Sequence, residues 1–169
     1  SSGLHSPQYV QCAQLMSKPD KAKKLCESLS KKIKNEFKEF DIILSPAMGG
    51  IVIGYEIGRL LNIETIFSER VNGVFELRRD FSIKKDQKVL IVEDVITTGK
   101  SSLECSKLVL DKKANIVGYA CLIDRSKGKS LLKEKIVSQV EIDIPTYTKN
   151  NLPNNLSALK AVKPGSRNI

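Results

Sequence analysis

Hydrophobic and polar residues follow one another along this chain with two different periods. Between residues 20 and 37, apolar side chains recur every three or four positions and lysines fill the other face, which predicts an amphipathic helix. Similar spacing predicts helices over residues 47–62 and 101–111. Short apolar runs predict buried strands, and these runs occupy residues 41–44, 64–67, 88–92, 116–123 and 136–142.

The order of these elements indicates the fold class. Strands alternate with helices, which is typical of a parallel α/β sheet with helices on its faces. Because ligands bind outside the carboxyl ends of the strands in such sheets, the candidate site lies in the loops over residues 45–50, 93–100 and 124–129. The length of 169 residues suits one domain with one sizeable core.

Composition and net charge limit the classes of molecule that this chain is expected to bind. The chain is 41% hydrophobic and 28% charged, which is ordinary for a soluble globular protein. The net charge of +9 is compatible with nucleic acid, with an anionic small molecule or with a lysine-rich exterior. Aromatic residues make up only 5%, and no arginine-rich stripe interleaves with them, so we expect no nucleic-acid partner.

The cysteines and the longest apolar runs bear on the compartment. Cys12, Cys26, Cys105 and Cys121 form no CxxC pair, which favours buried thiols in a reducing cytoplasm. No apolar run approaches the ~20 residues that span a membrane, and no signal peptide is visible. The chain begins without Met, so either residues precede Ser1 in the full protein or its first three residues are a cloning remnant.

Residues 88–102, "KVLIVEDVITTGKSS", carry the first chemistry. A strand, a tight loop and a helix place free backbone N–H groups and the positive end of a helix at one point, which favours an anion. Thr97, Thr98 and Ser101 add hydroxyl donors, and Gly99 allows close approach of the backbone. The nucleoside-triphosphate P-loop pattern fails, because its first glycine would fall at Asp94.

Two carboxylates, Glu93 and Asp94, come just before this loop. They would disfavour a phosphate unless they contact something else. Sugar hydroxyls and Mg²⁺ are the obvious partners of carboxylates. A ribose 5-phosphate with a metal-bound pyrophosphate would satisfy every group in the loop. The alternative is a strand end with solvated acids followed by a helix cap.

Residues 89–101, "VLIVEDVITTGKS", resemble the 5-phosphoribosyl 1-pyrophosphate (PRPP) signature of type I phosphoribosyltransferases. The resemblance implies that family's α/β fold, a largely parallel twisted sheet flanked by helices with a small N-terminal hood, as a single domain over residues 1–169. In that family the acids hold the ribose 2- and 3-hydroxyls and the loop holds the 5-phosphate. The implied PRPP contacts are Met48, Gly49, Glu93, Asp94, Val95, Ile96, Thr97, Thr98, Gly99, Lys100 and Ser101.

Four further segments resemble the orotate branch of the family, in the right order along the chain. "SSGLHSPQYV" is similar to the hood segment of that branch. Because this similarity already begins at Ser1, the resemblance implies that the first part of the hood is missing from this sequence. "SPAMGGIVIGYEIG" is similar to its pyrophosphate loop, "LIDRSKG" to the strand end that reads the orotate carboxylate, and "AVKPGSR" to tails in a bacterial branch. The implied orotate contacts are Ser2, Gly3, Tyr9, Thr97 and Arg125.

Two of these assignments have alternatives on physical grounds. The planar guanidinium of Arg125 suits bidentate pairing with a carboxylate, and the alternative is a surface ion pair with the neighbouring Asp124. His5, the single histidine, could act as a general base. Its place near the start of the chain favours a hood or packing role.

Residues 69–85 hold a strong hairpin-turn signal at Asn72-Gly73, flanked by Arg70, Arg78 and Arg79. The segment is either an exposed basic hairpin or the mobile loop that, in this family, closes over pyrophosphate from the neighbouring subunit. On the second interpretation Arg70 joins the two acids as a catalytic residue. The best-known branch carries a catalytic lysine and a histidine in this loop, whereas this chain has arginines and no histidine.

The resemblance as a whole predicts a reaction and its requirements. The predicted enzyme transfers the phosphoribosyl group from PRPP to orotate, giving orotidine 5′-monophosphate and pyrophosphate in UMP synthesis. It implies a cytoplasmic homodimer and a Mg²⁺ ion bound mainly through PRPP, with no metal ligand confidently assigned to the protein. The alternatives are a purine or uracil phosphoribosyltransferase, and a PRPP-sensing regulator that does no chemistry.

Overall fold

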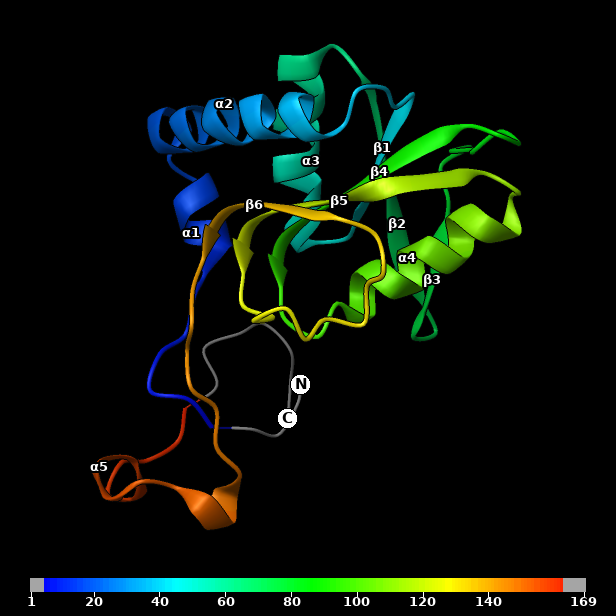
Figure 1. Ribbon diagram of the computed structural model, residues 1–169. Coiled ribbons are helices and arrows are strands. Elements are labelled where there is room, and N and C mark those ends of the chain that lie inside the picture. The colour runs from blue at the N-terminus through cyan, green and yellow to red at the C-terminus, as the bar shows by residue number, and fades with distance from the viewer. Residues whose placement is uncertain (1–4, 163–169) are drawn as a thin grey trace. The chain divides into compact units, whose positions relative to one another are not determined.

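The computed structural model describes residues 5–162 (Figure 1). Its helices are α1 (Cys12–Met16), α2 (Pro19–Glu36), α3 (Gly49–Leu61), α4 (Lys100–Asp111), the 3₁₀ helix η1 (Lys149–Asn151) and α5 (Asn154–Ser157). Its strands are β1 (Ile42–Pro46), β2 (Glu64–Val71), β3 (Val74–Leu77), β4 (Lys88–Ile96), β5 (Asn115–Asp124) and β6 (Ile136–Glu141).

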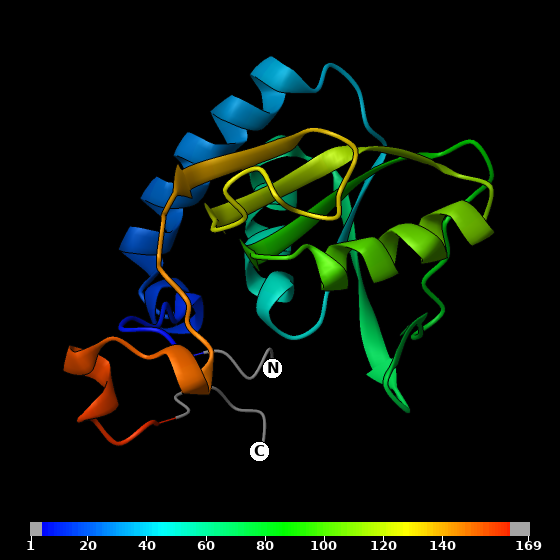
Figure 2. The same ribbon diagram turned by 60° about the horizontal axis from the view of Figure 1, so that its bottom comes forward.

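The strands form one six-stranded sheet in the order β3-β2-β1-β4-β5-β6. Every neighbouring pair is parallel except β2 and β3, which form an antiparallel hairpin. Helices α2 and α3 cover one face and α4 covers the other, as Figures 1 and 2 show. The predicted parallel α/β sheet flanked by helices is therefore confirmed.

The core follows from strands that are covered on both faces. All five residues of β1 are buried, as expected for a central strand of a parallel sheet. Between the sheet and α4, Ile91, Val109 and Tyr119 belong to one cluster of buried side chains. On the other face, α2 contributes Leu29 and Ile33, both fully buried.

Three glycines at every fourth position let α3 lie close to the sheet. A Cβ atom at Gly54 would overlap the Ser45 hydroxyl on β1, and one at Gly58 would overlap the Thr65 hydroxyl on β2. At Gly50 an added Cβ would lie 3.0 Å from a carbonyl oxygen of β4. The close approach matters because the loop that leads into α3 is one of the three candidate loops.

Four strands extend beyond their predicted ends: β1 to Pro46, β2 to Val71, β4 to Ile96 and β5 to Asp124, so the first residues of the three predicted loops belong to strands. The β4 strand continues past Val92 to Ile96, because the neighbouring β5 continues its register as far as Asp124 opposite Ile96. Glu93 and Asp94 therefore lie in the strand and not in a loop, which corrects the prediction for residues 93–100. The predicted hairpin turn is confirmed at Asn72, but β2 reaches Val71, so Arg70 also lies in a strand.

The chain divides into two units, residues 12–142 and the described part of residues 1–11 and 143–169. The larger unit holds the sheet and helices α1–α4. In the smaller unit, the two ends of the chain pair through an isolated antiparallel bridge: the His5 N–H donates to the Tyr147 carbonyl at 2.8 Å, and the Tyr147 N–H donates back at 2.9 Å. Ser2 and Gly3, two predicted orotate contacts, lie outside the described residues.

The outer edge of β6 carries a contact from α2. The Lys32 ammonium group donates to the Ser138 carbonyl at 3.0 Å and to the Gln139 carbonyl at 2.8 Å. The Gln139 side chain donates in turn to the Ser28 hydroxyl at 3.1 Å. Helix α2 is thereby fastened along the open edge of the sheet.

Candidate active site

The strand order brings the three candidate loops to one edge of the sheet. Strand β1 pairs in parallel with β4, and β4 pairs in parallel with β5. Their carboxyl ends therefore lie side by side, and β1 is also the strand from which the chain order departs in both directions. Such a switch point is where open α/β sheets bind ligands.

One of the two acids, Asp94, meets the loop after β1. The side chain of Glu93 is buried, at 8% exposure. The Asp94 carboxylate accepts a hydrogen bond from the Val95 N–H at 2.8 Å. An added Cβ at Gly49 would lie 2.7–2.9 Å from three atoms of the Asp94 carboxyl group, so the two predicted PRPP segments are in contact. Met48, beside Gly49, follows a cis peptide bond and is 82% exposed.

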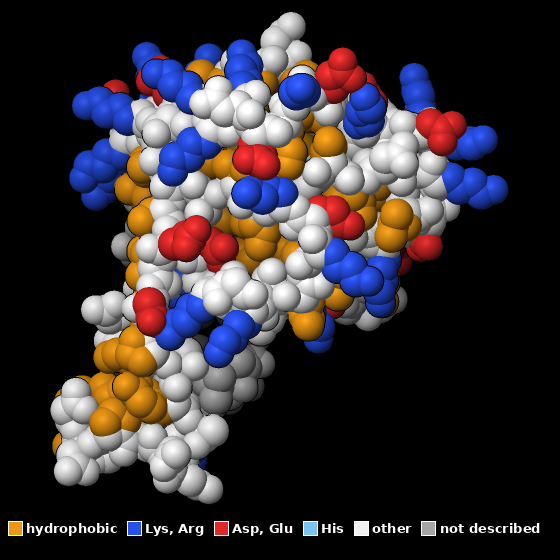
Figure 3. Space-filling model, viewed as in Figure 1, with side chains coloured by type: hydrophobic (Ala, Val, Ile, Leu, Met, Phe, Trp, Pro, Cys, Tyr) orange, Lys and Arg blue, Asp and Glu red, His pale blue; other side chains and the backbone are white. Residues whose placement is uncertain are grey.

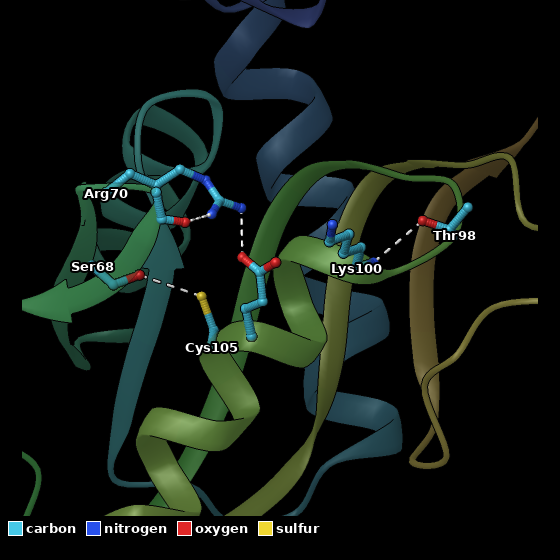
Figure 4. Close-up of polar contacts among 7 residues, drawn as sticks. Ser68, Arg70, Thr98, Lys100 and Cys105 are labelled. Atoms are coloured by element: carbon cyan, nitrogen blue, oxygen red, sulfur yellow. Dashed lines mark hydrogen bonds and ion pairs between the residues drawn. The ribbon is translucent and has the colours of Figure 1, made fainter. Parts of the chain in front are cut away.

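The phosphate loop has the shape that the sequence predicts. Thr97 and Thr98 are exposed, and Gly99, the N-cap residue just before α4, adopts a left-handed conformation with φ of 77°. The Lys100 N–H donates to the Thr98 hydroxyl at 3.4 Å, which Figure 4 shows. The first turn of α4 contains no acidic residue, so the positive end of the helix is not neutralised there.

The side chain of Ile96, a predicted PRPP contact, does not reach the surface of the site. Its side chain is 1% exposed and belongs to the core. Its carbonyl oxygen accepts a hydrogen bond from the Arg125 N–H at 2.8 Å. Any contact of Ile96 with PRPP would therefore have to come from its main chain.

Arg125 follows β5, directly beside the phosphate loop. Its Nε atom is buried and has no hydrogen-bond partner among residues 5–162. The Asp124 carboxylate accepts instead from the Ser126 N–H at 2.7 Å, and the described residues contain no ion pair between Asp124 and Arg125. A buried guanidinium nitrogen without a partner is costly in free energy unless a ligand supplies the acceptor.

Comparison with known proteins agrees with this geometry. A profile of the phosphoribosyl transferase domain matches residues 14–153. The orotate phosphoribosyltransferase of Parvibaculum lavamentivorans is 46% identical over 170 residues, covering 100% of this chain and 88% of that protein. The orotate phosphoribosyltransferase of Rhizorhabdus wittichii is 45% identical, covering 99% of this chain and 86% of that protein. The chain belongs to the orotate phosphoribosyltransferase family.

Solved structures share the fold of this phosphoribosyltransferase at lower identity. The orotate phosphoribosyltransferase of Aeropyrum pernix superimposes with a TM-score of 0.69 at 17% identity, covering 79% of this chain and 78% of that one. The adenine phosphoribosyltransferase of Thermoanaerobacter pseudethanolicus superimposes with a TM-score of 0.70 at 18% identity, covering 79% of this chain and 88% of that one. These structural similarities establish the fold. They do not show which base is transferred, because that depends on the side chains of the site.

The hairpin arginines of this phosphoribosyltransferase are already engaged. Arg70 donates to the Gly73 carbonyl at 2.6 Å and to the Glu104 carboxylate on α4 at 2.5 Å (Figure 4). Its guanidinium also lies 4.1 Å from the centre of the Phe75 ring. Arg70 thus joins the hairpin to the helix that begins at the phosphate loop, and its catalytic role remains a prediction.

The other two arginines follow β3. Arg79 donates to both carboxylate oxygens of Glu69, at 3.1 and 2.9 Å, and these hydrogen bonds hold the pKa of Glu69 below its usual value. Arg78 and Arg79 are both exposed. Their proposed closure over pyrophosphate remains a prediction, and in this structure Arg79 is paired within its own hairpin.

The cysteines are buried thiols, as predicted. Burial, reinforced by the nearby Asp94 charge, raises the pKa of Cys12 to about 12. Burial also raises the pKa of Cys105 to about 12, although its Sγ atom lies 3.3 Å from the Ser68 hydroxyl (Figure 4). Both groups stay protonated near neutral pH and are poor nucleophiles.

Some contacts around the site carried no signal in the sequence. Glu104 lies mid-helix among ordinary helix formers, and its arginine partner is 34 residues away. Leu132 lies in an aperiodic segment, yet its side chain contacts Gly99 of the phosphate loop. Neither could be found without knowing which elements are neighbours in space.

The remaining findings concern metals, membranes and surface charge. Residues 5–162 contain no group of three or more side chains able to hold a metal ion, and no helix among them is long and apolar enough to cross a membrane. On the face drawn in Figure 3, Lys and Arg side chains are spread out with Asp and Glu between them. This face offers no continuous basic stripe of the kind that follows a nucleic-acid backbone.

Proposed function

We propose that this protein is a cytoplasmic orotate phosphoribosyltransferase that converts PRPP and orotate to orotidine 5′-monophosphate and pyrophosphate. The observation that carries the choice of base is the buried, unpartnered Nε atom of Arg125 beside the phosphate loop. Orotate differs from uracil by a carboxylate, which a guanidinium pairs with bidentately. The names of the relatives at 45–46% identity support the same choice.

Different residues of the site bind different parts of PRPP. The N-terminus of α4, with Thr97 and Thr98, binds the 5-phosphate through N–H and hydroxyl donors. Glu93 and Asp94 accept hydrogen bonds from the ribose hydroxyls and stabilise the positive charge that develops on the ribose as its bond to pyrophosphate breaks. The loop at Gly49 lies against Asp94, which places the pyrophosphate beside the ribose.

A magnesium ion fits the donor set of this edge of the sheet. The Asp94 carboxylate beside the Gly49 loop is an oxygen ligand of the kind that Mg²⁺ prefers, and Mg²⁺ is commonly held by one or two carboxylates together with substrate phosphates and water. Since the described residues contain no cluster of three ligands, the pyrophosphate of PRPP would supply most of the coordination. When bound, the ion neutralises charge on the departing pyrophosphate.

The assignment is tested by following the loss of orotate absorbance with PRPP and Mg²⁺ present. Arg125→Ala should raise the KM for orotate by about 100-fold or more, because a charged bidentate pair is lost. Arg59→Ala is the matched control, since Arg59 lies in the last turn of α3, which begins at the site with Gly49, and pairs with Glu56 on the same helix. Turnover of adenine or uracil in place of orotate, or full activity of Arg125→Ala, would refute the choice of base.

We also propose that the protein is a homodimer. Two large apolar side chains on α3 are exposed: Val52 at 53% and Tyr55 at 65%. Their spacing of three residues places them on one face of the helix, away from the glycines that contact the sheet. Such an apolar face supports association with a second copy.

The oligomeric state is tested by sedimentation. The wild-type protein should have twice the mass of the 18.8 kDa chain. Tyr55→Asp should shift the equilibrium toward the monomer, whereas Leu110→Asp, at a position on α4 that is 58% exposed, should not. A wild-type protein that sediments as a monomer at micromolar concentration would contradict the proposal.

A further inference from the structure

The segment between β5 and β6, residues 125–135, lies against the loop over residues 97–100 that is proposed to bind the 5-phosphate. Its Leu131 N–H donates to the Thr98 carbonyl at 2.9 Å. The carbonyl of the peptide that precedes Gly99 is therefore held by this segment and does not point freely into solvent. Because a peptide group is planar, fixing the Thr98 carbonyl also fixes the direction of the Gly99 N–H.

Leu132 completes the contact on the other side of Gly99. A Cβ atom added to Gly99 would lie 2.7 Å from the Leu132 Cγ atom and 3.2 Å from each of its two methyl carbons. The leucine side chain thus occupies the space directly against the Gly99 backbone. Gly99 has φ of 77°, a region that favours glycine, so the loop has its turn at the residue that Leu132 covers.

Both ends of the segment are anchored to the elements that flank the loop. At its start, the Arg125 N–H donates to the Ile96 carbonyl at the end of β4. Near its end, Glu134 accepts from the Tyr119 hydroxyl at 3.1 Å, and this hydroxyl lies 2.8 Å from that of Ser106 on α4. The segment is consequently fixed at both ends, with Leu132 pressed on Gly99 between them.

We propose that Leu132 is a positioning residue for PRPP, which holds the Thr98-Gly99 turn in the shape that receives the 5-phosphate. The inference rests on the proposed function, because it assumes that the loop binds that phosphate. Leu132 touches no substrate atom in this account. It acts by keeping the loop's N–H groups aimed at one point before the ligand arrives, so that binding does not have to order them.

The first test measures binding by calorimetry with two probes, PRPP and pyrophosphate. Leu132→Ala should weaken PRPP about tenfold, as loosened positioning groups do, and leave pyrophosphate, which lacks the 5-phosphate, unchanged. Leu132→Met should restore most of the PRPP affinity by refilling the space. Leu108→Ala is the matched control, because Leu108 is also half-buried and packs on the same core cluster without contacting Gly99.

Equal weakening of PRPP by Leu132→Ala and Leu108→Ala would overturn the proposal, since general loosening would then explain both. Unchanged PRPP affinity in Leu132→Ala would also overturn it. If the wild-type protein binds no PRPP at all, the proposed function fails, and a second measurement then decides whether Leu132 shapes the loop.

That second measurement is a double-mutant cycle on stability, which needs no substrate. Gly99→Ala should lower the urea midpoint strongly in the wild-type background and less in the Leu132→Ala background, because the shortened side chain makes room for the new methyl group. The backbone strain at Gly99 is the same in both backgrounds and cancels. Strictly additive losses would show that Leu132 does not confine Gly99, whatever the ligand.

Discussion

The contact between Gly49 and Asp94 makes a strong prediction for a single methyl group. In Gly49→Ala, the new Cβ would lie 2.7–2.9 Å from the Asp94 carboxyl group, well inside normal contact distance. The Asp94 carboxylate therefore has to move away from its present position, which strains its 2.8 Å hydrogen bond from the Val95 N–H. The displaced carboxylate no longer reaches the ribose hydroxyl in the proposed complex.

The size of the effect on activity follows from the loss of the hydrogen bond between the ribose hydroxyl and the Asp94 carboxylate. A hydrogen bond to a charged group contributes about 1.5–3 kcal/mol, so kcat/KM should fall by about 10- to 100-fold. Stability should fall by about 1 kcal/mol, because the strain on the Val95–Asp94 hydrogen bond is partly offset by the better helix propensity of alanine at the first residue of α3. The assay is steady-state orotate consumption, accompanied by thermal unfolding of the same preparation.

The control variant Gly73→Ala separates the loss of stability from the loss of activity. Gly73→Ala places a methyl group in open space, with nothing within 4 Å, but at φ of 86°. It should lose about 1 kcal/mol of stability from backbone strain and retain its kcat/KM. Full activity in Gly49→Ala would refute the argument that the β1 loop and the acid pair form one rigid wall of the site.

Three further predictions test the core, the buried thiols and the hairpin. Gly54→Ala should destabilise the protein by about 1–3 kcal/mol, because its methyl group would overlap the buried Ser45 hydroxyl; an unchanged urea midpoint would contradict the close packing of α3. Burial raises the pKa of Cys26 from 9.0 to about 12, so its neutral thiol contributes stability that is complete below pH 9 and is lost as the pH rises toward 12. The free energy of unfolding should therefore fall less steeply with pH in Cys26→Ser than in the wild-type protein over that range. If the two proteins lose stability in parallel, this explanation is wrong. If Arg70 acts on the substrate, Arg70→Gln should lower kcat about tenfold or more while Glu104→Gln, which removes only its partner, changes kcat little; equal losses would assign the effect to the ion pair.

The parts of the fold that could be predicted are those that local sequence determines. The strand ending in Val92 and the loop at Gly99 were predictable because an apolar run and a run of hydroxyl and glycine residues each have one common structural meaning. Arg125 was predicted as a carboxylate reader from the resemblance to the orotate branch and from the planar shape of its guanidinium, with a surface ion pair to Asp124 as the alternative, and this role stays a prediction. Its unpartnered Nε atom is the structural counterpart of that expectation.

The parts that could not be predicted depend on neighbours that are distant in the chain. Glu93 and Asp94 resemble loop residues locally, but the register of β5 extends β4 through them. Arg70 appeared to belong to a loop because the turn signal two residues later does not indicate how far the strands on either side extend. The contact of Leu132 with Gly99 joins residues from two different connections, and no spacing rule links them.

The contact of Lys32 with β6 has a consequence for the behaviour of the chain during folding. An open sheet edge presents unpaired carbonyl and N–H groups that can recruit a strand from another molecule. At the β6 edge the Lys32 ammonium group occupies the Ser138 carbonyl, so an incoming strand would have to displace a charged side chain. At the opposite edge β3 is only four residues long, too short to serve as a good template. Both edges of the sheet are therefore guarded against strand addition and the aggregation that follows from it.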